Sequence, residues 1–354
     1  MFFKCAAHAP ERGAGGGRRS SRPAGSVTID IHCHRLSAAA AEKVKAESGS
    51  PDRAALSYGN ELSREVNRKQ LEIVRPKMQN LNERFADMDA QGVDIQVISV
   101  PPFQFYYWVD AELTRDVHRA LNDEMAGISA AHPDRLVAMA TVPLQNTEMA
   151  IAELERCVSE HDMRAVAIGT NVDGEELSDP KREKFFARAE ELGVLIFLHP
   201  ESFTHQERFG EHYFINLFGH PLDSSLAIGR LIFDGVIARH PDLKICVAHG
   251  GGFLPAYPGR IDHGYHARAD CRVNISQPPS TYLKKFYFDT MVFDPDQLGF
   301  LIRHYGADHI LLGTDYPFDM GEEDPCGLVG RVADLSNAER AAIAGGNAAK
   351  LLGI

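Results

Sequence analysis

Four histidines and one aspartate stand at positions where such side chains could share a metal ion. His32 and His34 are separated by a single residue in IDIHCH, so on a β-strand their imidazoles would point to the same face. His199, His249 and Asp315 lie in the segments FLHP, VAHGGG and GTDYPF, each at the end of a short apolar run. Imidazole and carboxylate ligands suit Zn²⁺, and Mn²⁺, Co²⁺ or Fe²⁺ are also compatible. A metal site therefore requires elements that bring these side chains together.

The surrounding sequence predicts short strands that alternate with helices. Apolar or β-branched runs indicate eight strands, at Val27–Cys33, Val93–Val100, Leu136–Val142, Arg164–Thr170, Val194–His199, Lys244–His249, Phe286–Thr290 and His309–Thr314. Helical spacing is found between them, at Asn82–Gln91, Ala111–Ala131, Thr147–His161, Lys181–Leu192, Leu222–Arg239 and Asp294–Tyr305. Eight such units predict an α/β protein with a (β/α)8 TIM barrel. An open nucleotide-binding sheet would have a glycine-rich turn after its first strand, where this chain has histidines.

The predicted barrel also explains where the chemical groups lie, because functional residues of TIM barrels occupy the C-terminal ends of the strands. His32 and His34 close the first strand, His199 ends the fifth, His249 ends the sixth, and Asp315 follows the eighth. Each residue alone has an ordinary explanation, such as helix capping by Asp315. Their joint position at one barrel mouth predicts a metal site.

The remaining motifs do not point to other chemistry. The run HGGG after the sixth strand resembles the oxyanion loop of lipases, but the chain has no G-x-S-x-G nucleophile motif. It also has no P-loop, dinucleotide fingerprint or CxxC zinc motif. Other histidines are interpreted as solvated or packing residues, namely His118, His132, His161, His205, His212, His220, His240, His304 and His309.

Charge and length limit the partners and the domain organisation. The 354 residues carry a net charge of −12, which argues against nucleic acid or an anionic membrane as the main partner. Residues 1–26 are rich in Gly, Arg and Ser and are predicted to be a disordered basic tail. Residues 27–354 are predicted to form the barrel, with residues 35–80 as an insertion over its mouth because they are too long for an ordinary loop.

The cysteines and the apolar runs indicate the compartment. The six cysteines are scattered, without a CxxC pair, which favours a reducing, cytoplasmic location. No apolar run approaches the roughly 18 residues of a membrane-spanning helix, so we expect no membrane partner.

The ordered set IDIHCH, FLHP, VAHGGG and GTDYPF resembles the amidohydrolase superfamily, and more narrowly its aminocarboxymuconate-semialdehyde decarboxylase-like branch of metal-dependent decarboxylases. The resemblance implies one divalent metal ion held by His32, His34, His199 and Asp315, with a water ligand near His249. Members with two metals commonly use a lysine at the end of the fourth strand, where this chain has Thr170-Asn171. A single metal is therefore expected, most simply Zn²⁺.

The same resemblance implies non-oxidative decarboxylation of an unsaturated or aromatic carboxylate, such as a catabolite like aminocarboxymuconate semialdehyde. Either the metal-bound water starts the reaction with His249 as acid and base, or Asp315 protonates the substrate carbon. The alternative is a hydrolase or hydratase of the same superfamily, similar to a lactonase. A third hypothesis is a catalytically silent barrel retained for binding.

Three arginines are candidate ligands of the substrate carboxylate. Arg75 lies in an Arg-Pro pair that is similar to a carboxylate-binding pair of the family. Arg260 matches an arginine that reaches into the neighbour's site in dimeric relatives, and Arg268 matches another near that interface. The resemblance thus implies a homodimer that shares Arg260 and binds a small carboxylate.

Two departures from the family pattern suggest a different substrate. Glu201 follows the His-Pro pair, and Arg35 follows the first-strand histidines, where the decarboxylase that typifies the branch has aromatic residues. We therefore expect an extra carboxylate and an extra guanidinium near the barrel mouth.

Overall fold

The computed structural model describes residues 26–48, 59–201 and 208–354. The predicted disordered tail at 1–26 lies outside the described residues, apart from Ser26. In the described part of the chain, no helix combines the length and the apolar character needed to cross a membrane.

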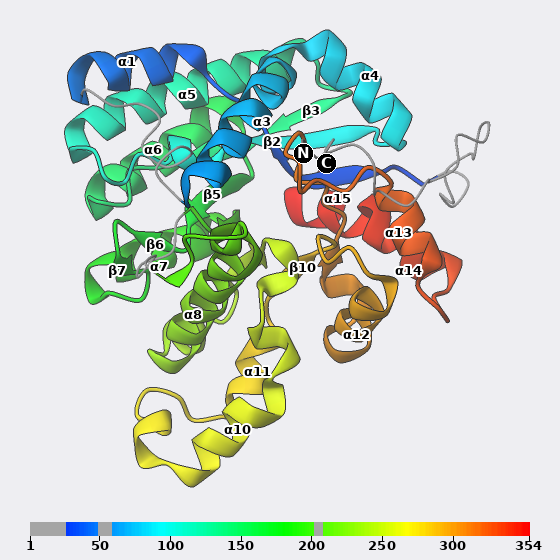
Figure 1. Ribbon diagram of the computed structural model, residues 1–354. Helices are drawn as coiled ribbons and strands as arrows, with labels where there is room; N and C mark the ends of the chain where they lie inside the picture. Colours follow the sequence, from blue (N-terminus) through cyan, green and yellow to red (C-terminus); the bar gives the residue numbers. More distant parts are fainter. Residues whose placement is uncertain (1–25, 49–58, 202–207) are drawn as a thin grey trace.

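Parallel strands form a closed barrel, which confirms the predicted (β/α)8 fold (Figure 1). The strands of the barrel pair in parallel within two sheets, one of three strands and one of six. The strands are β1 (Ile29–His34), β2 (Ile95–Ser99), β3 (Leu136–Ala138), β4 (Ala140–Thr141), β5 (Ala165–Gly169), β8 (Leu195–His199), β9 (Lys244–Val247), β10 (Tyr287–Asp289) and β11 (Ile310–Leu311). A separate antiparallel hairpin consists of β6 (Asn171–Val172) and β7 (Glu175–Glu176).

The third predicted strand differs from the prediction because it is divided at Met139. Its first part, β3, pairs with β2, and its second part, β4, pairs with β5. The amide of Met139 still donates to the carbonyl oxygen of Ile98, with an N···O distance of 3.0 Å. The ring of strands therefore continues through this residue.

The last strand closes the barrel against the first along a seam of backbone hydrogen bonds. The amide of Ile31 donates to the carbonyl oxygen of Leu312 at 2.9 Å, and that of Asp315 donates to the carbonyl oxygen of His32 at 2.7 Å. The amide of His34 donates to the carbonyl oxygen of Tyr316 at 2.8 Å. This seam places the His-x-His pair beside the segment that carries Asp315.

The helices follow the predicted spacing closely. The helices after β1 are α1 (Ala38–Ser48), α3 (Glu61–Gln79), α4 (Leu81–Gln91), α5 (Ala111–Ala131), α6 (Thr147–His161), α7 (Glu183–Leu192), α8 (His220–Phe233), α9 (Val236–Arg239), α10 (Pro258–Ala267), α11 (Pro279–Leu283), α12 (Pro295–Tyr305), α13 (Pro325–Arg331), α14 (Asn337–Ala341) and α15 (Asn347–Leu352). The single helix predicted at Leu222–Arg239 is instead two helices, because Gly235 adopts a left-handed φ of 81° between α8 and α9.

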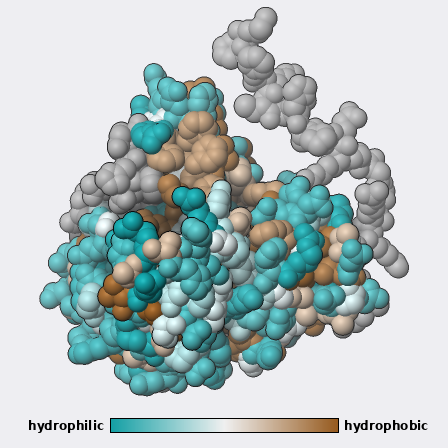
Figure 2. All heavy atoms as spheres, turned by 90° about the horizontal axis from the view of Figure 1, so that it is seen from below, coloured by the Kyte–Doolittle hydropathy of each residue, from teal (hydrophilic) through white to brown (hydrophobic). Residues whose placement is uncertain are grey.

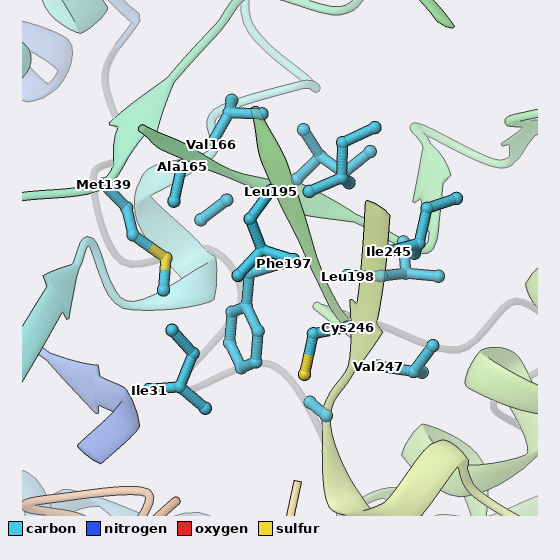
Figure 3. Close-up of a cluster of buried hydrophobic side chains, with 14 of the residues drawn as sticks. Ile31, Met139, Ala165, Val166, Leu195, Phe197, Leu198, Ile245, Cys246 and Val247 are labelled. Atoms are coloured by element: carbon cyan, nitrogen blue, oxygen red, sulfur yellow. The ribbon is translucent and has the colours of Figure 1, made fainter. Parts of the chain in front are cut away.

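The core is built around strands that are buried on both faces. All residues of β8 are buried, as expected for a parallel strand covered by helices. Phe197 of β8 is the register partner of Cys246 in β9, and Figure 3 shows both side chains in the same cluster. The Phe197 ring also contacts the His32 imidazole, with 5.0 Å between the ring centres. The apolar core therefore forms the floor beneath the predicted metal site.

The insertion places one helix over the barrel mouth, whereas another helical segment extends away from the barrel. Ser63, Asn67, Leu71 and Val74 of α3 recur at the spacing of one helix face and line the pocket at the mouth. In contrast, α10 and α11 form an arm that projects from the barrel (Figure 1).

Candidate metal centre

The structure brings together all five residues of the predicted site. One ligand atom from each of His32, His199, His249 and Asp315 can be chosen such that these atoms all lie within 4.8 Å of one another. His34 joins them, because its Nε2 lies 3.2 Å from Asp315 Oδ1. These residues come from β1, β8 and the segments that follow β9 and β11. The strand-end rule therefore located the cluster correctly.

Three of the histidines are suited to metal binding, since each has its Nδ1 occupied by another group. His32 Nδ1 lies 2.6 Å from Asp289 Oδ2, and His34 Nδ1 lies 3.2 Å from the carbonyl oxygen of Val100. His199 Nδ1 lies 2.7 Å from the carbonyl oxygen of the next residue. When Nδ1 carries the donated proton, the lone pair on Nε2 remains available to a metal ion.

Unpartnered buried nitrogen atoms support the same assignment. Within the described residues, Nε2 of His32 and Nε2 of His199 are buried and have no hydrogen-bond partner. Nε2 of His32 is only 3.2 Å from Asp315 Oδ1, but the two atoms are not aligned for a hydrogen bond. Buried polar atoms normally have a partner. The close, unbonded approach of these nitrogen and oxygen atoms is what we expect of ligands that bind one common cation.

The electrostatics of the metal-free site indicate that it needs positive charge. Burial lowers the pKa of His32, but the carboxylates of Asp315 and Asp289 outweigh this effect and raise it to about 10. Burial, together with the neighbouring histidines, holds the pKa of His199 well below its usual range. Burial raises the pKa of Asp315, but His32 and the other imidazoles bring it well below its ordinary value. A divalent cation would supply the charge that the proton on His32 supplies in its absence.

Asp289 connects this ligand set to the loop of His249. Its Oδ2 accepts from the His249 amide at 3.0 Å, and its Oδ1 accepts from the Gly250 amide at 2.7 Å. His249 has a φ of 56° and Asp315 a φ of 54°, a left-handed conformation that is costly for residues other than glycine. Asp289 therefore helps to hold a strained backbone at the site. The sequence analysis missed this residue, although it is the last residue but one of the predicted strand Phe286–Thr290 and ends the observed strand β10, where the strand-end rule applied.

The cluster opens into a cavity of about 160 Å³ beneath α3. The described residues that line it include the ionisable groups His199, Glu201, His220, His249, Asp315 and Asp319. Burial raises the pKa of Glu201 to about 8, with further contributions from Asp173 and Asp223. The extra carboxylate expected at the mouth thus does line the pocket.

His220 differs from the other histidines that were interpreted as solvated or packing residues. It begins α8 and lines the pocket, and burial lowers its pKa to about 4, with a smaller effect from His249. No local sequence pattern identified His220, because this residue lies far along the chain from the end of β8.

The predicted arginines lie outside the pocket of the described chain. Arg75 is exposed on α3, next to the pocket-lining Val74. Arg260 is exposed on α10, and Arg268 at the end of that helix pairs with Asp270 at 2.7 Å.

Arg35 does not supply the extra guanidinium expected at the mouth. It is buried, and its Nη1 lies 2.6 Å from Glu124 Oε1 of α5. This ion pair joins the segment after β1 to a helix of the barrel, and Arg35 is absent from the described residues that line the pocket.

Comparison with known families decides the assignment of the barrel. The family model described as Amidohydrolase matches residues 29–354. The chain belongs to the amidohydrolase family. This match confirms the resemblance carried by the four motifs.

Several amidohydrolase-family decarboxylases are similar to the chain. It is 38% identical over 272 residues to 2-amino-3-carboxymuconate-6-semialdehyde decarboxylase of Dictyostelium discoideum, covering 77% of this chain and 76% of that protein. The crystal structure of 5-carboxyvanillate decarboxylase from Sphingomonas paucimobilis matches with a TM-score of 0.82 and 25% identity, over 93% of this chain and 99% of that one. A dihydroxybenzoic acid decarboxylase from Polaromonas, solved with manganese and 2-nitroresorcinol, has a TM-score of 0.78 and 23% identity, over 93% and 97% of the two chains.

Proposed function

We propose that this amidohydrolase is a metal-dependent carboxy-lyase that removes CO₂ from a small aromatic or unsaturated carboxylate. The observation that carries the proposal is the convergence of three imidazoles and Asp315 at the mouth, with Nδ1 of each ligand histidine already occupied. The named decarboxylases among its relatives and structural neighbours support the choice of reaction.

One divalent ion would be held by His32, His34, His199 and Asp315. Zn²⁺ is our first candidate for this mixed set of imidazole and carboxylate ligands, and Mn²⁺, which a structural neighbour binds, is the second. When bound, the ion supplies Lewis acidity that polarises oxygen atoms of the substrate and of water.

His249 is the proposed acid and base. Decarboxylation breaks the bond between the carboxylate and the adjacent carbon, and the electron pair left on that carbon must take a proton. His249 lines the pocket, and its Nε2 lies 3.6 Å from Asp315 Oδ2. An imidazole can both donate and accept a proton, so His249 can deliver this proton and recover one afterwards, with Asp315 as the adjacent proton carrier.

The substrate carboxylate also needs a cationic group besides the metal. The described lining of the pocket contains neither Lys nor Arg. We assign this role to Arg260 of a second copy, because α10 carries Arg260 away from the barrel of its own chain (Figure 1). Arg268 is proposed to support that interface, and Arg75 is proposed to lie at the rim of the pocket beside Val74.

An exposed apolar surface beside α10 supports a homodimer. Leu222 and Leu226 lie one turn apart on α8, and Ser225 between them accepts a hydrogen bond from the Phe253 amide at 2.7 Å. Leu222 is 40% exposed and Tyr257, just before α10, is 54% exposed. Figure 2 shows a largely hydrophilic surface that is interrupted by hydrophobic patches. Pairing two copies through this surface would bury apolar area next to Arg260.

We also propose a reducing cytoplasmic location. The cysteines in the described part of the chain are free, namely Cys33, Cys157, Cys246, Cys271 and Cys326. Most of these thiols are buried, as is usual for structural cysteines in reduced proteins.

The decisive experiment is a screen of hydroxybenzoates, muconate semialdehydes and lactones with the metal-loaded protein, measuring CO₂ release and product mass. The proposal predicts a product lighter than its substrate by one CO₂, and a strongly reduced rate of release by His249→Ala. A product heavier by one water would instead establish a hydrolase or hydratase. Full activity after complete removal of the metal would contradict both metal-dependent reactions.

A further inference from the structure

A buried arginine of α4 reaches the backbone seam beside the proposed metal ligands. Arg84 is fully buried, and its Nη2 donates a hydrogen bond to the carbonyl oxygen of His34, the last residue of β1. Its guanidinium carbon lies 4.8 Å from the centre of the Tyr316 ring. His34 and Tyr316 meet across the seam, where the amide of His34 donates to the carbonyl oxygen of Tyr316 at 2.8 Å. Arg84 thus contacts both edges of the seam.

A second residue of α4 holds the far edge of the seam. Asp87 lies three positions after Arg84, so the two side chains are neighbours on the helix surface. Asp87 Oδ2 accepts hydrogen bonds from the Tyr316 hydroxyl and from Lys77 Nζ of α3, both at 2.9 Å. Because Tyr316 directly follows Asp315, this contact restrains the segment that carries the carboxylate ligand. It also fastens α3, which covers the pocket, to the same point.

A chain of hydrogen bonds continues from the arginine to the first strand. Arg84 Nη1 donates to Gln96 Oε1 of β2 at 2.7 Å, and Gln96 Nε2 donates to Asp30 Oδ2 at 3.0 Å. Asp30 Oδ1 accepts from the amides of His32 and Thr314, both at 3.0 Å. The chain therefore runs from α4 to the backbone of a second ligand histidine and to the residue before the ligand aspartate.

The charge of Arg84 argues against a role in packing alone. Within the described part of the chain, Arg84 forms no ion pair, and the two acceptors named above are neutral. A buried cation without a direct counter-ion destabilises the folded state, and an apolar side chain of similar volume would avoid that penalty. A guanidinium instead offers a rigid fork of donors that can hold two acceptors at fixed positions. Both acceptors of this fork belong to the framework of the site.

We propose that Arg84 and Asp87 are positioning residues, through which α4 holds the two ligands that meet at the seam. This inference rests on the proposed function, in which His34 and Asp315 bind one metal ion. Neither Arg84 nor Asp87 is among the described residues that line the pocket, so neither is expected to contact the substrate. Displacement of either ligand would distort the coordination and weaken metal binding.

Metal binding by Arg84→Met tests the inference without requiring turnover. Methionine fills much of the same space but removes the fork and the charge. We expect the affinity for Zn²⁺ to fall about 10- to 100-fold in chelator competition. The visible absorption bands of the Co²⁺-loaded protein should also change, because they report the ligand geometry. Arg84→Lys, which keeps a donor and the charge, should restore part of the affinity.

The matched control is Arg182→Met, which removes another fully buried arginine. Arg182 donates to the carbonyl oxygen of Glu176 at 2.9 Å and to Glu175 Oε2 at 2.7 Å, at the hairpin of β6 and β7. Its loss should make the protein less resistant to denaturant while metal affinity and the Co²⁺ bands remain unchanged. The control therefore separates a general loss of stability from a displaced ligand.

Tyr316→Phe is a milder variant that decides the question if Arg84→Met does not fold. It removes only the hydroxyl group bound by Asp87, and we expect metal affinity to fall about 2- to 10-fold. The inference is overturned if the deciding variant binds metal as tightly as the wild type with unchanged Co²⁺ bands. Tighter binding by Arg84→Met would also overturn it, because this is the result expected if Arg84 acts only as a charge that repels the ion.

CO₂ release by the wild type is measured separately. Release combined with metal binding that does not depend on α4 would reject the positioning role alone. Metal binding that depends on Arg84 without release from any tested carboxylate would reject the proposed reaction alone.

Discussion

The carboxylate of Asp289 accepts a hydrogen bond from the imidazole of His32 at 2.6 Å and holds the backbone amide of His249 at 3.0 Å. One buried side chain thus orients a proposed metal ligand and fixes the loop of the proposed acid and base. Asp289 does not line the pocket, so its role is to position His32 and the His249 loop and not to contact the substrate.

Asp289→Asn should weaken metal binding while the fold is retained. Asparagine can replace only part of the carboxylate's contacts, so either His32 or the loop amides lose their acceptor. We expect metal affinity to fall by about 10- to 100-fold, measured by chelator competition and metal analysis. Asp294→Ala is the control, because it removes a helix cap at α12 and should cost about 1 kcal/mol of stability without changing metal affinity. Equal metal affinity in wild type and Asp289→Asn would refute the positioning role.

The ligand set and the acid–base residue should respond differently to substitution. His199→Ala removes an imidazole that ends β8, so the purified protein should lose most of its metal. His249→Ala should keep the metal but lose about 10²- to 10⁴-fold in turnover, which is typical for removal of a general acid or base. Metal content and single-turnover rates distinguish the two variants. Near-normal turnover in His249→Ala would remove this residue from the mechanism.

A mixture of two inactive variants tests the shared arginine. His249→Ala and Arg260→Ala homodimers should both have little activity. If Arg260 acts in the partner's pocket, random mixed dimers restore one site in each heterodimer, or about a quarter of all sites. Activity is measured after subunit exchange, with heterodimer formation confirmed by mass spectrometry. Inactive heterodimers would place Arg260 outside the site.

Buried His118 predicts a specific loss of stability in acid. Its Nε2 lies 3.1 Å from the carbonyl oxygen of Phe105 in the core, and burial lowers its pKa to about 4 from the ordinary value of 6.5. Between these values the unfolded chain binds a proton that the folded chain excludes, so stability falls as the pH decreases through this window. The effect on the free energy of unfolding is about 2 kcal/mol between pH 7 and pH 5.

Urea unfolding at several pH values measures this effect. His118→Gln should flatten the decline between pH 7 and pH 5, whereas His304→Gln, on the exposed side of α12, should leave it unchanged. An unaltered pH dependence in His118→Gln would show that other groups cause the decline.

The HGGG loop should tolerate no side chain at its third glycine. Gly252 has a φ of 69°, and an added Cβ would lie 2.1 Å from the backbone oxygen of Pro221, next to the pocket residue His220. Gly252→Ala should therefore cost at least about 2 kcal/mol of stability, measured by denaturant unfolding. Gly229→Ala in α8 is the matched control, since its Cβ would meet nothing within 4 Å and should stabilise the helix slightly. Equal stability of the two variants would contradict the close approach.

The sequence predicted those features that follow from local periodicity. The His-x-His pair and the histidine of FLHP end predicted strands, and the barrel topology alone brings those ends together. The division at Met139 was not predictable, because the run through it is uniformly apolar and the change of pairing partner depends on barrel curvature. His220 was missed for a similar reason, since its place at the pocket is set by the packing of α8 and not by its own neighbours in sequence.

The backbone seam between the first and last strands also implies an order in which the parts of the site form during folding. His34 and Asp315 are 281 positions apart, yet their side chains meet across that seam. During synthesis, the emerging chain carries three imidazoles long before the aspartate exists, and the edge of β1 has no partner on that side until the final strand arrives. The complete ligand set forms only when the barrel closes. We therefore expect complete coordination of the metal to be a late step of folding, which would link the first strand of the barrel to its last.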